Sequence, residues 1–224
     1  AASSKAALNI TAPQIVRWHT CPNENAFRQQ AVDVVLDAAK AAIHERGRFD
    51  IVLAGGGTPR RVYEALRETE TDWAAWHVYF GDERCLPETD TERNSRMANE
   101  AWLSHVSIPS AQIHPIPGEA GAPIAAAVYA ATLSGVGDFD LVLLGLGEDG
   151  HTASLFPAAS ETVMALAGDA PPVMAINSVK DEPRITLTLP LLLAADTILL
   201  HIEGKEKRAA FDKAVAGDDT LEMP

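Results

Sequence analysis

Four short, almost uninterrupted apolar runs constrain the fold of this chain more than any other feature of its sequence. They are Ile51–Ala54, Val78–Phe80, Leu141–Leu144 and Thr197–Ile202. A strand with one face in water alternates apolar and polar residues, whereas a parallel strand that is covered on both faces does not. The runs therefore predict parallel strands that are buried on both faces.

Helix-like segments separate these runs. Apolar residues recur at helical spacing up to Arg46, and Gly47 follows as a stop. Pro59 suits the first turn of a second helix. Strands that alternate with helices predict an α/β fold, Rossmann-like, with a mostly parallel sheet and helices on both faces. The expected helices are Ala26–Arg46, Pro59–Leu66, Ala125–Leu133 and Lys205–Val215.

The chain has 224 residues and no internal repeat or low-complexity linker. This length suits one α/β domain with a sizeable core. We expect a single domain over residues 1–224, in which residues 1–25 form an N-terminal extension and first-strand region.

The charge balance limits the partners of this chain. It has 18 Lys and Arg against 31 Asp and Glu, a formal charge of -13. Nucleic-acid affinity comes mainly from Lys and Arg, so we expect no nucleic-acid partner. A few cations in one cleft can still bind a small anion.

Membrane and metal functions find no support in the sequence. Polar residues interrupt the longest apolar stretch, Ile185–Ile202, and Ala1–Ala7 lacks the apolar core of a signal peptide. Cys21 and Cys85 are the only cysteines, which indicates a reducing compartment and offers no zinc framework. We therefore expect a cytoplasmic location, no membrane partner and no metal.

A triple glycine follows the first apolar run: Gly55, Gly56 and Gly57, then Thr58 and Pro59. Glycines allow a ligand to approach the backbone closely, and a helix N-terminus favours an anion. The alternative is a plain tight turn in which Thr58 caps the helix.

Three charged residues follow the second run, in the segment Gly81-Asp82-Glu83-Arg84. Asp82 can order water or bind sugar hydroxyls, and the planar guanidinium of Arg84 can hold a phosphate. The alternative is a solvated turn in which Asp82 or Glu83 pairs with Arg84.

The third run leads into Gly145-Leu-Gly147-Glu-Asp149-Gly150-His151. Histidine titrates near neutral pH, so His151 is suited to general-base work, and Asp149 can orient its ring. The alternative is a histidine satisfied by local hydrogen bonds. No second histidine and no cysteine lies near His151 as a further metal ligand, and no Gly-x-Ser-x-Gly elbow accompanies it.

Together these segments resemble the glucosamine-6-phosphate isomerase/6-phosphogluconolactonase family from about Ala26 to the chain end. The motifs are Gly-Gly-Gly-Thr-Pro, Gly-Asp-Glu-Arg, Gly-Glu-Asp-Gly-His-Thr-Ala-Ser-Leu-Phe-Pro and Lys-Asp-Glu-Pro-Arg-Ile-Thr-Leu-Thr. The sequence that follows His151, Thr152–Pro157, favours the lactonase branch of the family. The resemblance implies a NagB/RpiA/CoA transferase-like fold and hydrolysis of 6-phospho-D-glucono-1,5-lactone, with no cofactor. It also implies a monomer or weak homodimer.

The resemblance also implies roles for individual residues. His151 is the general base, and Asp149 and Arg84 complete the catalytic set. The residues implied to bind the sugar and the phosphate of the substrate are Gly55, Gly56, Gly57, Thr58, Asp82, Arg84, Asn94 and Lys180.

Three departures from the family pattern stand out. Glu92-Arg93-Asn94-Ser95 replaces a common Asp-Ser-Asn-Tyr run, and Val179 replaces a proline before Lys180. Family members usually continue beyond the position of Pro224 into one more strand, so we expect that strand to be absent here.

Two other functions remain open from the sequence. One is a glucosamine-6-phosphate deaminase-isomerase, which would use the same fold and glycine loop. The other is a non-catalytic sugar-phosphate-binding effector domain.

Overall fold

The computed structural model describes residues 15–217, 219 and 222–224. Most of the expected N-terminal extension, residues 1–14, lies outside this part, and residues 15–21 carry no strand. The strands are β1 Phe49–Leu53, β2 Trp76–Phe80, β3 Asp82–Arg84, β4 Leu141–Gly145, β5 Val173–Ile176, β6 Arg184–Leu187 and β7 Thr197–His201. The α-helices are α1 Glu24–Arg46, α2 Gly57–Leu66, α3 Asn94–Ala101, α4 Ala122–Leu133, α5 Thr162–Ala165, α6 Leu189–Leu193 and α7 Lys205–Ala216.

The four predicted strands form one parallel sheet in the order β2-β1-β4-β7. All five residues of β1 are buried, and so are the first four of β4. The α/β prediction with a mostly parallel sheet is therefore confirmed. The carboxyl ends of these strands share one edge, because all four run in the same direction.

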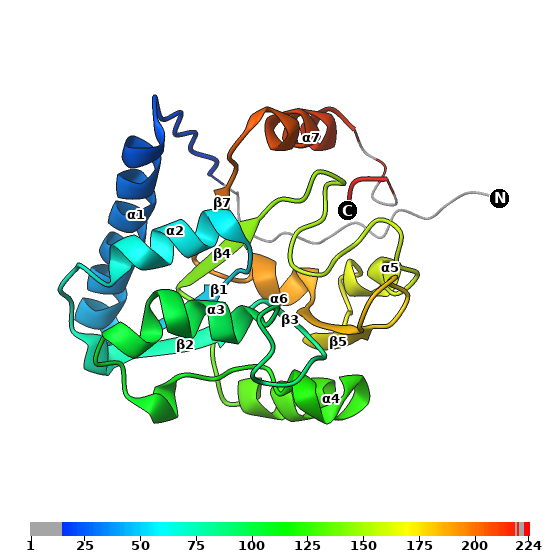
Figure 1. Ribbon diagram of the computed structural model, residues 1–224, viewed down its shortest axis with the longest axis horizontal. Helices are drawn as coiled ribbons and strands as arrows, with labels where there is room; N and C mark the ends of the chain where they lie inside the picture. The colour runs from blue at the N-terminus through cyan, green and yellow to red at the C-terminus, as the bar shows by residue number, and fades with distance from the viewer. Residues whose placement is uncertain (1–14, 218, 220–221) are drawn as a thin grey trace.

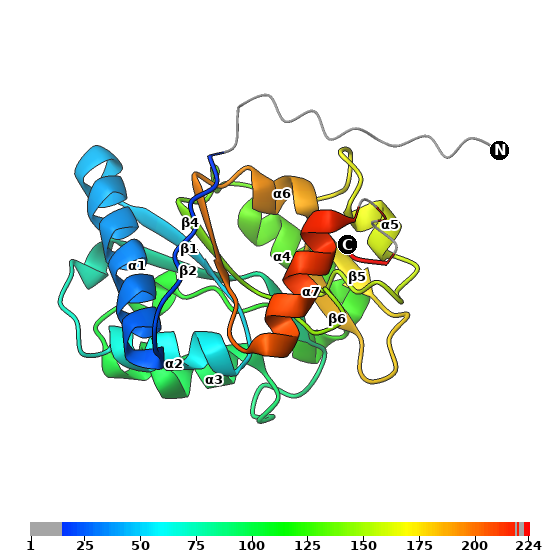
Figure 2. The same ribbon diagram turned by 90° about the horizontal axis from the view of Figure 1, so that it is seen from above.

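Helices cover both faces of this sheet. α1 packs against β1 and β7, and α1, α2 and α3 lie side by side (Figure 1). Figure 2 shows α4 and α6 on the side of the sheet opposite α1. Within the described residues no helix is long and apolar enough to cross a membrane.

The limits of α1 follow from its capping residues. The Asn23 side chain accepts a hydrogen bond from the Ala26 amide at 2.9 Å, which satisfies a free donor of the first turn. Gly47 adopts a φ of 69° and donates its amide to the Ile43 carbonyl at 2.8 Å. Gly47 therefore ends the helix as predicted, in a left-handed conformation that favours glycine.

A second sheet was not predicted. It is antiparallel, in the order β3-β6-β5, and its first strand, β3, consists of three charged residues. Gly81 joins the two sheets, since its amide donates to the Leu53 carbonyl at 2.9 Å and its carbonyl accepts from the Leu187 amide at 2.8 Å. The segment after β2 therefore passes directly from one sheet into the other.

One histidine is buried and two others are partly buried. His201, at the end of β7, is 3% exposed, and neither ring nitrogen has a hydrogen-bond partner among the described residues. Burial lowers the pKa of His201 to about 4. Burial, and then the charge of Arg48, also lowers the pKa values of His77 and His114. All three rings therefore resist protonation in the folded chain.

These histidines predict an acid-sensitive fold. At these three positions the unfolded chain binds more protons than the folded chain between pH 6.5 and about 4, so their contribution to the free energy of unfolding falls as pH falls through that window. His201 alone accounts for about 3 kcal/mol of this loss. Urea unfolding across this range measures the effect. His201→Leu should flatten the profile, and an unchanged slope in this variant would contradict the assignment.

Candidate functional site

The structure brings the glycine loop, the acidic turn and the histidine segment to one edge of the parallel sheet. They follow β1, β2 and β4 at their carboxyl ends. Asn94 lies against Gly55, because a Cβ atom on Gly55 would stand 2.1 Å from the Asn94 Oδ1 atom. The Ser154 hydroxyl donates to the Asp82 Oδ2 atom at 2.7 Å, which joins the histidine segment to the acidic turn.

The glycine loop leaves the N-terminus of α2 open. Gly56 precedes the helix with a φ of 100°, a conformation that only glycine adopts readily. No side chain caps the helix, and Gly56 and Gly57 are exposed. The first-turn amides of a helix need hydrogen-bond acceptors, so this loop can receive an anion.

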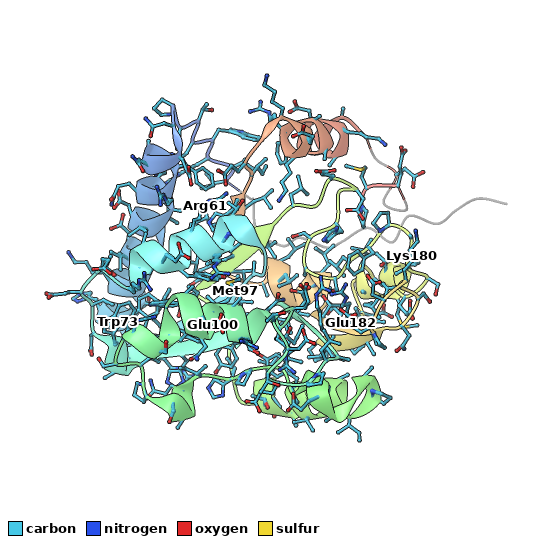
Figure 3. The ribbon with its side chains drawn as sticks, in the orientation of Figure 1. Arg61, Trp73, Met97, Glu100, Lys180 and Glu182 are labelled. Carbon is cyan, nitrogen blue, oxygen red and sulfur yellow. The ribbon has the colours of Figure 1, made fainter. Side chains whose placement is uncertain are left out.

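Thr58 does not cap α2, which corrects one of the two interpretations from the sequence. Its buried hydroxyl donates to the Glu203 Oε2 atom at 3.0 Å, and Glu203 also pairs with Arg61. Figure 3 shows Arg61 on α2, on the side toward α1. Partial burial alone would raise the pKa of Glu203, but the hydrogen bonds from Arg61 and Thr58 outweigh it and lower this pKa. Glu203 is a carboxylate beside the glycine loop that the sequence analysis did not identify.

Asp82 is the central acceptor of the acidic turn. Its carboxylate accepts from Ser154 and from the Asn94 Nδ2 atom, the latter at 3.1 Å. Burial raises the pKa of Asp82, although the Ser154 hydrogen bond and the charge of His151 oppose the shift. Asp82 and Asn94 therefore contact each other directly, and each is anchored by the other.

Glu83 has a structural role. Its fully buried carboxylate accepts from the amides of Asn94 and Ser95 at 2.8 and 2.9 Å, and it lies 3.1 Å from the Arg93 Nε atom. The alternative interpretation from the sequence, in which Glu83 forms an ion pair with Arg84, is therefore wrong. Arg93, which departs from the family pattern, is buried as the counter-charge of Glu83.

Arg84 instead pairs with carboxylates outside the acidic turn. Its Nη1 atom donates to the Glu182 Oε1 atom at 2.7 Å and lies 3.6 Å from Glu92. The expected ion pair with Asp82 is not formed either, since the Asp82 side chain bonds to Asn94 and Ser154.

Lys180 was expected to bind the phosphate, but it does not lie with the other site residues. It is exposed and makes no hydrogen bond or ion pair with any residue that the structure describes. Figure 3 places Lys180 on the outer side, near α5, whereas Glu182 lies further in, near β3 and β5.

His151 and Asp149 form a close pair. The His151 Nδ1 atom lies 2.5 Å from the Asp149 Oδ1 atom, with side chains that are 32% and 51% exposed. Partial burial would raise the pKa of Asp149, but the hydrogen bonds from the His151 ring and amide outweigh it and lower this pKa. If Nδ1 carries the proton of this hydrogen bond, the Nε2 atom is left with a free electron pair. No described residue bonds to Nε2.

The backbone of the histidine segment is shaped around this ring. A Cβ atom on Gly147 would stand 2.2 Å from the His151 Nδ1 atom, and the Gly147 amide donates to the His151 carbonyl at 2.8 Å. Ala153 has a φ of 50°, the only positive value at a non-glycine residue in the described part of the chain. Such a conformation costs energy and persists where surrounding contacts impose it.

Two further residues at this site were not assigned a role from the sequence. The Phe156 ring packs against His151, with centroids 4.6 Å apart, and the Arg184 guanidinium lies 5.8 Å from the centre of the same ring. Burial, and then the charge of Arg84, lowers the pKa of Arg184. Both residues stand in quoted motifs, but nothing local in either motif indicates that β6 pairs with β3.

Metal ligands do not gather here. Across residues 15–217, 219 and 222–224 no group of three or more His, Cys, Asp or Glu side chains could hold a metal ion. The arrangement consists of a carboxylate-bound imidazole, exposed loop amides and two arginines. It can activate a water molecule near a bound anion.

Known proteins resemble this chain over most of its length. A family model described as glucosamine-6-phosphate isomerases/6-phosphogluconolactonase matches residues 22–224. A 6-phosphogluconolactonase of a Nostoc species is 36% identical, covering 91% of this chain and 87% of that protein. One from Mycobacterium tuberculosis is 37% identical with the same coverage. The crystal structure of a 6-phosphogluconolactonase from Shewanella baltica is 30% identical, with a TM-score of 0.83 over 89% of this chain and 86% of that one.

The contact between Gly147 and His151 generates a prediction. Gly147→Ala should displace the imidazole and break its bond to Asp149, because the new Cβ would overlap the Nδ1 atom. The ¹⁵N chemical shifts of the His151 ring report this bond. Gly135→Ala is the control, since a Cβ there meets no atom within 4 Å. Unchanged His151 shifts in Gly147→Ala would contradict the geometry.

Proposed function

The chain belongs to the glucosamine-6-phosphate isomerase/6-phosphogluconolactonase family, and from this premise we infer that its activity is that of the lactonases. It hydrolyses 6-phospho-D-glucono-1,5-lactone to 6-phospho-D-gluconate, a step of the oxidative pentose phosphate pathway. Relatives that carry this activity in their names, at 36% and 37% identity over most of both chains, support the assignment.

We propose that His151 is the general base of this reaction. The observation that carries the proposal is the His151–Asp149 pair, which lies at the carboxyl edge of the sheet with no described residue bonded to the Nε2 atom. A base that takes a proton from water needs such an accessible nitrogen. Asp149 acts as a positioning residue, because its carboxylate orients the ring and stabilises the imidazolium ion that forms.

The proton can be followed through the reaction. Nε2 takes a proton from water as the water oxygen attacks the lactone carbonyl carbon. The tetrahedral oxyanion then collapses, the bond from that carbon to the ring oxygen breaks, and the imidazolium returns the proton to the leaving oxygen. The product is an open-chain hydroxy acid. His151 is therefore regenerated in each turnover.

A donor must stabilise the oxyanion in this scheme. A backbone amide of the segment Gly145–Gly150 is a natural candidate. The amides of Gly147 and Gly150 already donate to His151 and Gly147 within the loop, at 2.8 and 3.0 Å. We therefore favour another amide of this segment.

The substrate phosphate anchors the other end of the molecule. The proposed binding groups are the glycine loop with Thr58, Arg84 and Lys180, and Asp82 and Asn94 lie where sugar hydroxyls can bond. Open helix amides at the loop and the guanidinium of Arg84 support this arrangement. Fixing the phosphate holds the lactone carbonyl near His151, which converts binding energy into orientation.

Replacing His151 tests the mechanism. His151→Gln should lower kcat for 6-phosphogluconolactone by about 10²–10⁴-fold, because general-base catalysis contributes that range. Binding of 6-phosphogluconate should remain nearly unchanged. The measurement is hydrolysis of freshly generated lactone, corrected for the spontaneous rate.

His44→Gln is the matched control, because His44 is exposed on α1, away from the site. Near-normal turnover by His151→Gln would remove the residue from the mechanism. Failure of the folded wild-type chain to accelerate hydrolysis would overturn the lactonase assignment. Release of ammonia from glucosamine 6-phosphate would then identify a deaminase.

A further inference from the structure

Two arginines face each other where the second sheet meets the site. Arg84 of β3 and Arg184 of β6 are directly paired in the antiparallel register. Two like charges at paired positions repel each other unless an anion lies between them. Among the described residues, the carboxylate that lies within 4 Å of both arginines is that of Glu182, from the loop that precedes β6.

Arg184 is poorly satisfied by its surroundings. Its side chain is 11% exposed, it donates no hydrogen bond to any described residue, and its Nε atom is buried without a partner. Its nearest carboxylate oxygen, on Glu182, lies 3.7 Å away, which is too far for a hydrogen bond. A buried guanidinium with unused donors is costly, so its position is explained best by a ligand that accepts from it.

Glu182 forms a hydrogen bond with Arg84 but not with Arg184. Its Oε1 atom lies 2.7 Å from the Arg84 Nη1 atom, and its side chain is 20% exposed. The backbone amide of Glu182 itself, and then Arg84, lower the pKa of this carboxyl. Glu182 is therefore shared by two cations; Glu92 adds a second carboxylate 3.6 Å from Arg84 but has no ion pair with Arg184, whose donors stay unfilled.

We propose that Glu182 is an internal anion that the substrate phosphate displaces, and that Arg184 is a second phosphate-binding guanidinium beside Arg84. The inference rests on the proposed function for the identity of the phosphate. A phosphate dianion neutralises both arginines and offers enough oxygens for both planar forks, whereas a single carboxylate does not.

This exchange sets the selectivity of the site. Every incoming anion must replace Glu182, so its net affinity is the difference between two sets of interactions. A monovalent anion replaces one negative charge with another, so the net free energy of binding is small. A phosphate dianion adds one charge and fills the empty donors of Arg184, and it is therefore preferred over a carboxylate.

Binding of inorganic phosphate to the full chain, measured by calorimetry, tests the proposal without turnover. Glu182→Gln should lower the Kd of phosphate by about tenfold, because the competing charge is removed while the side-chain shape is kept. Arg184→Gln should raise this Kd by about tenfold or more. Arg184→Lys should fall between Arg184→Gln and wild type, since it keeps the charge and loses the fork.

Asp181→Asn is the matched control, because it removes one exposed charge from the same loop without an ion pair to either arginine. Its Kd should change much less than that of Glu182→Gln. An equal gain would mean that the general negative field, rather than displacement, weakens phosphate binding, and that would overturn the proposal. Unchanged or weaker phosphate binding by Glu182→Gln would overturn it as well, since Glu182 would then only hold Arg84 in place.

Lactone kinetics separate this inference from the proposed function. With 6-phosphogluconolactone, Glu182→Gln should lower KM with little change in kcat, whereas Arg184→Gln should mainly raise KM. Absence of hydrolysis by the wild-type chain, together with the expected phosphate Kd pattern, would overturn the lactonase function alone. Hydrolysis by the wild type without that pattern would overturn the displacement alone. Thermal unfolding of each variant checks that the fold is kept.

Discussion

The buried carboxylate of Glu83 is the interaction on which the rest of the site depends. An ionised carboxylate without partners would be very costly in the protein interior. Here it accepts hydrogen bonds from the amides of Arg84, Asn94 and Ser95 and pairs with Arg93. These bonds tie the end of the acidic turn to the first turn of α3, so neither can move without breaking them.

The position of Asn94 follows from that anchor. Asn94 begins α3, and its side chain reaches Asp82 and fills the space beside Gly55. Asp82 in turn accepts from Ser154, three residues after His151. A chain of short polar contacts therefore runs from the buried carboxylate to Ser154, in the segment that carries the proposed base.

The parallel sheet could be predicted from the sequence because its strands contain continuous apolar runs, such as Ile51–Ala54, which are visible locally in the sequence. The capping of α1 by Gly47 was equally local. The antiparallel sheet was missed because Asp82–Arg84 is short and charged, and its pairing partner lies about a hundred residues away. Nothing in a charged tripeptide indicates which distant segment completes its hydrogen bonds.

The same limit applies to the site. His151 and Asp149 are two residues apart, so their pairing could be anticipated, and the structure shows it. Contacts across the fold could not be anticipated, such as the bond from Thr58 to Glu203. Their residue types allow several partners, and only the packed fold selects one. Lys180 remains a prediction from the family pattern.

The two sheets contribute different groups to the site. The imidazole is carried by the loop after β4 of the parallel sheet, whereas Arg184 and Glu182 belong to β6 and the loop before it, in the antiparallel sheet. Changes in the loop between β5 and β6 therefore act on the arginine pair directly and reach the imidazole only through the Phe156 ring that lies between Arg184 and His151. This separation makes the scaffold evolvable, because a duplicated gene could acquire a new substrate through one hairpin loop while inheriting its chemistry intact.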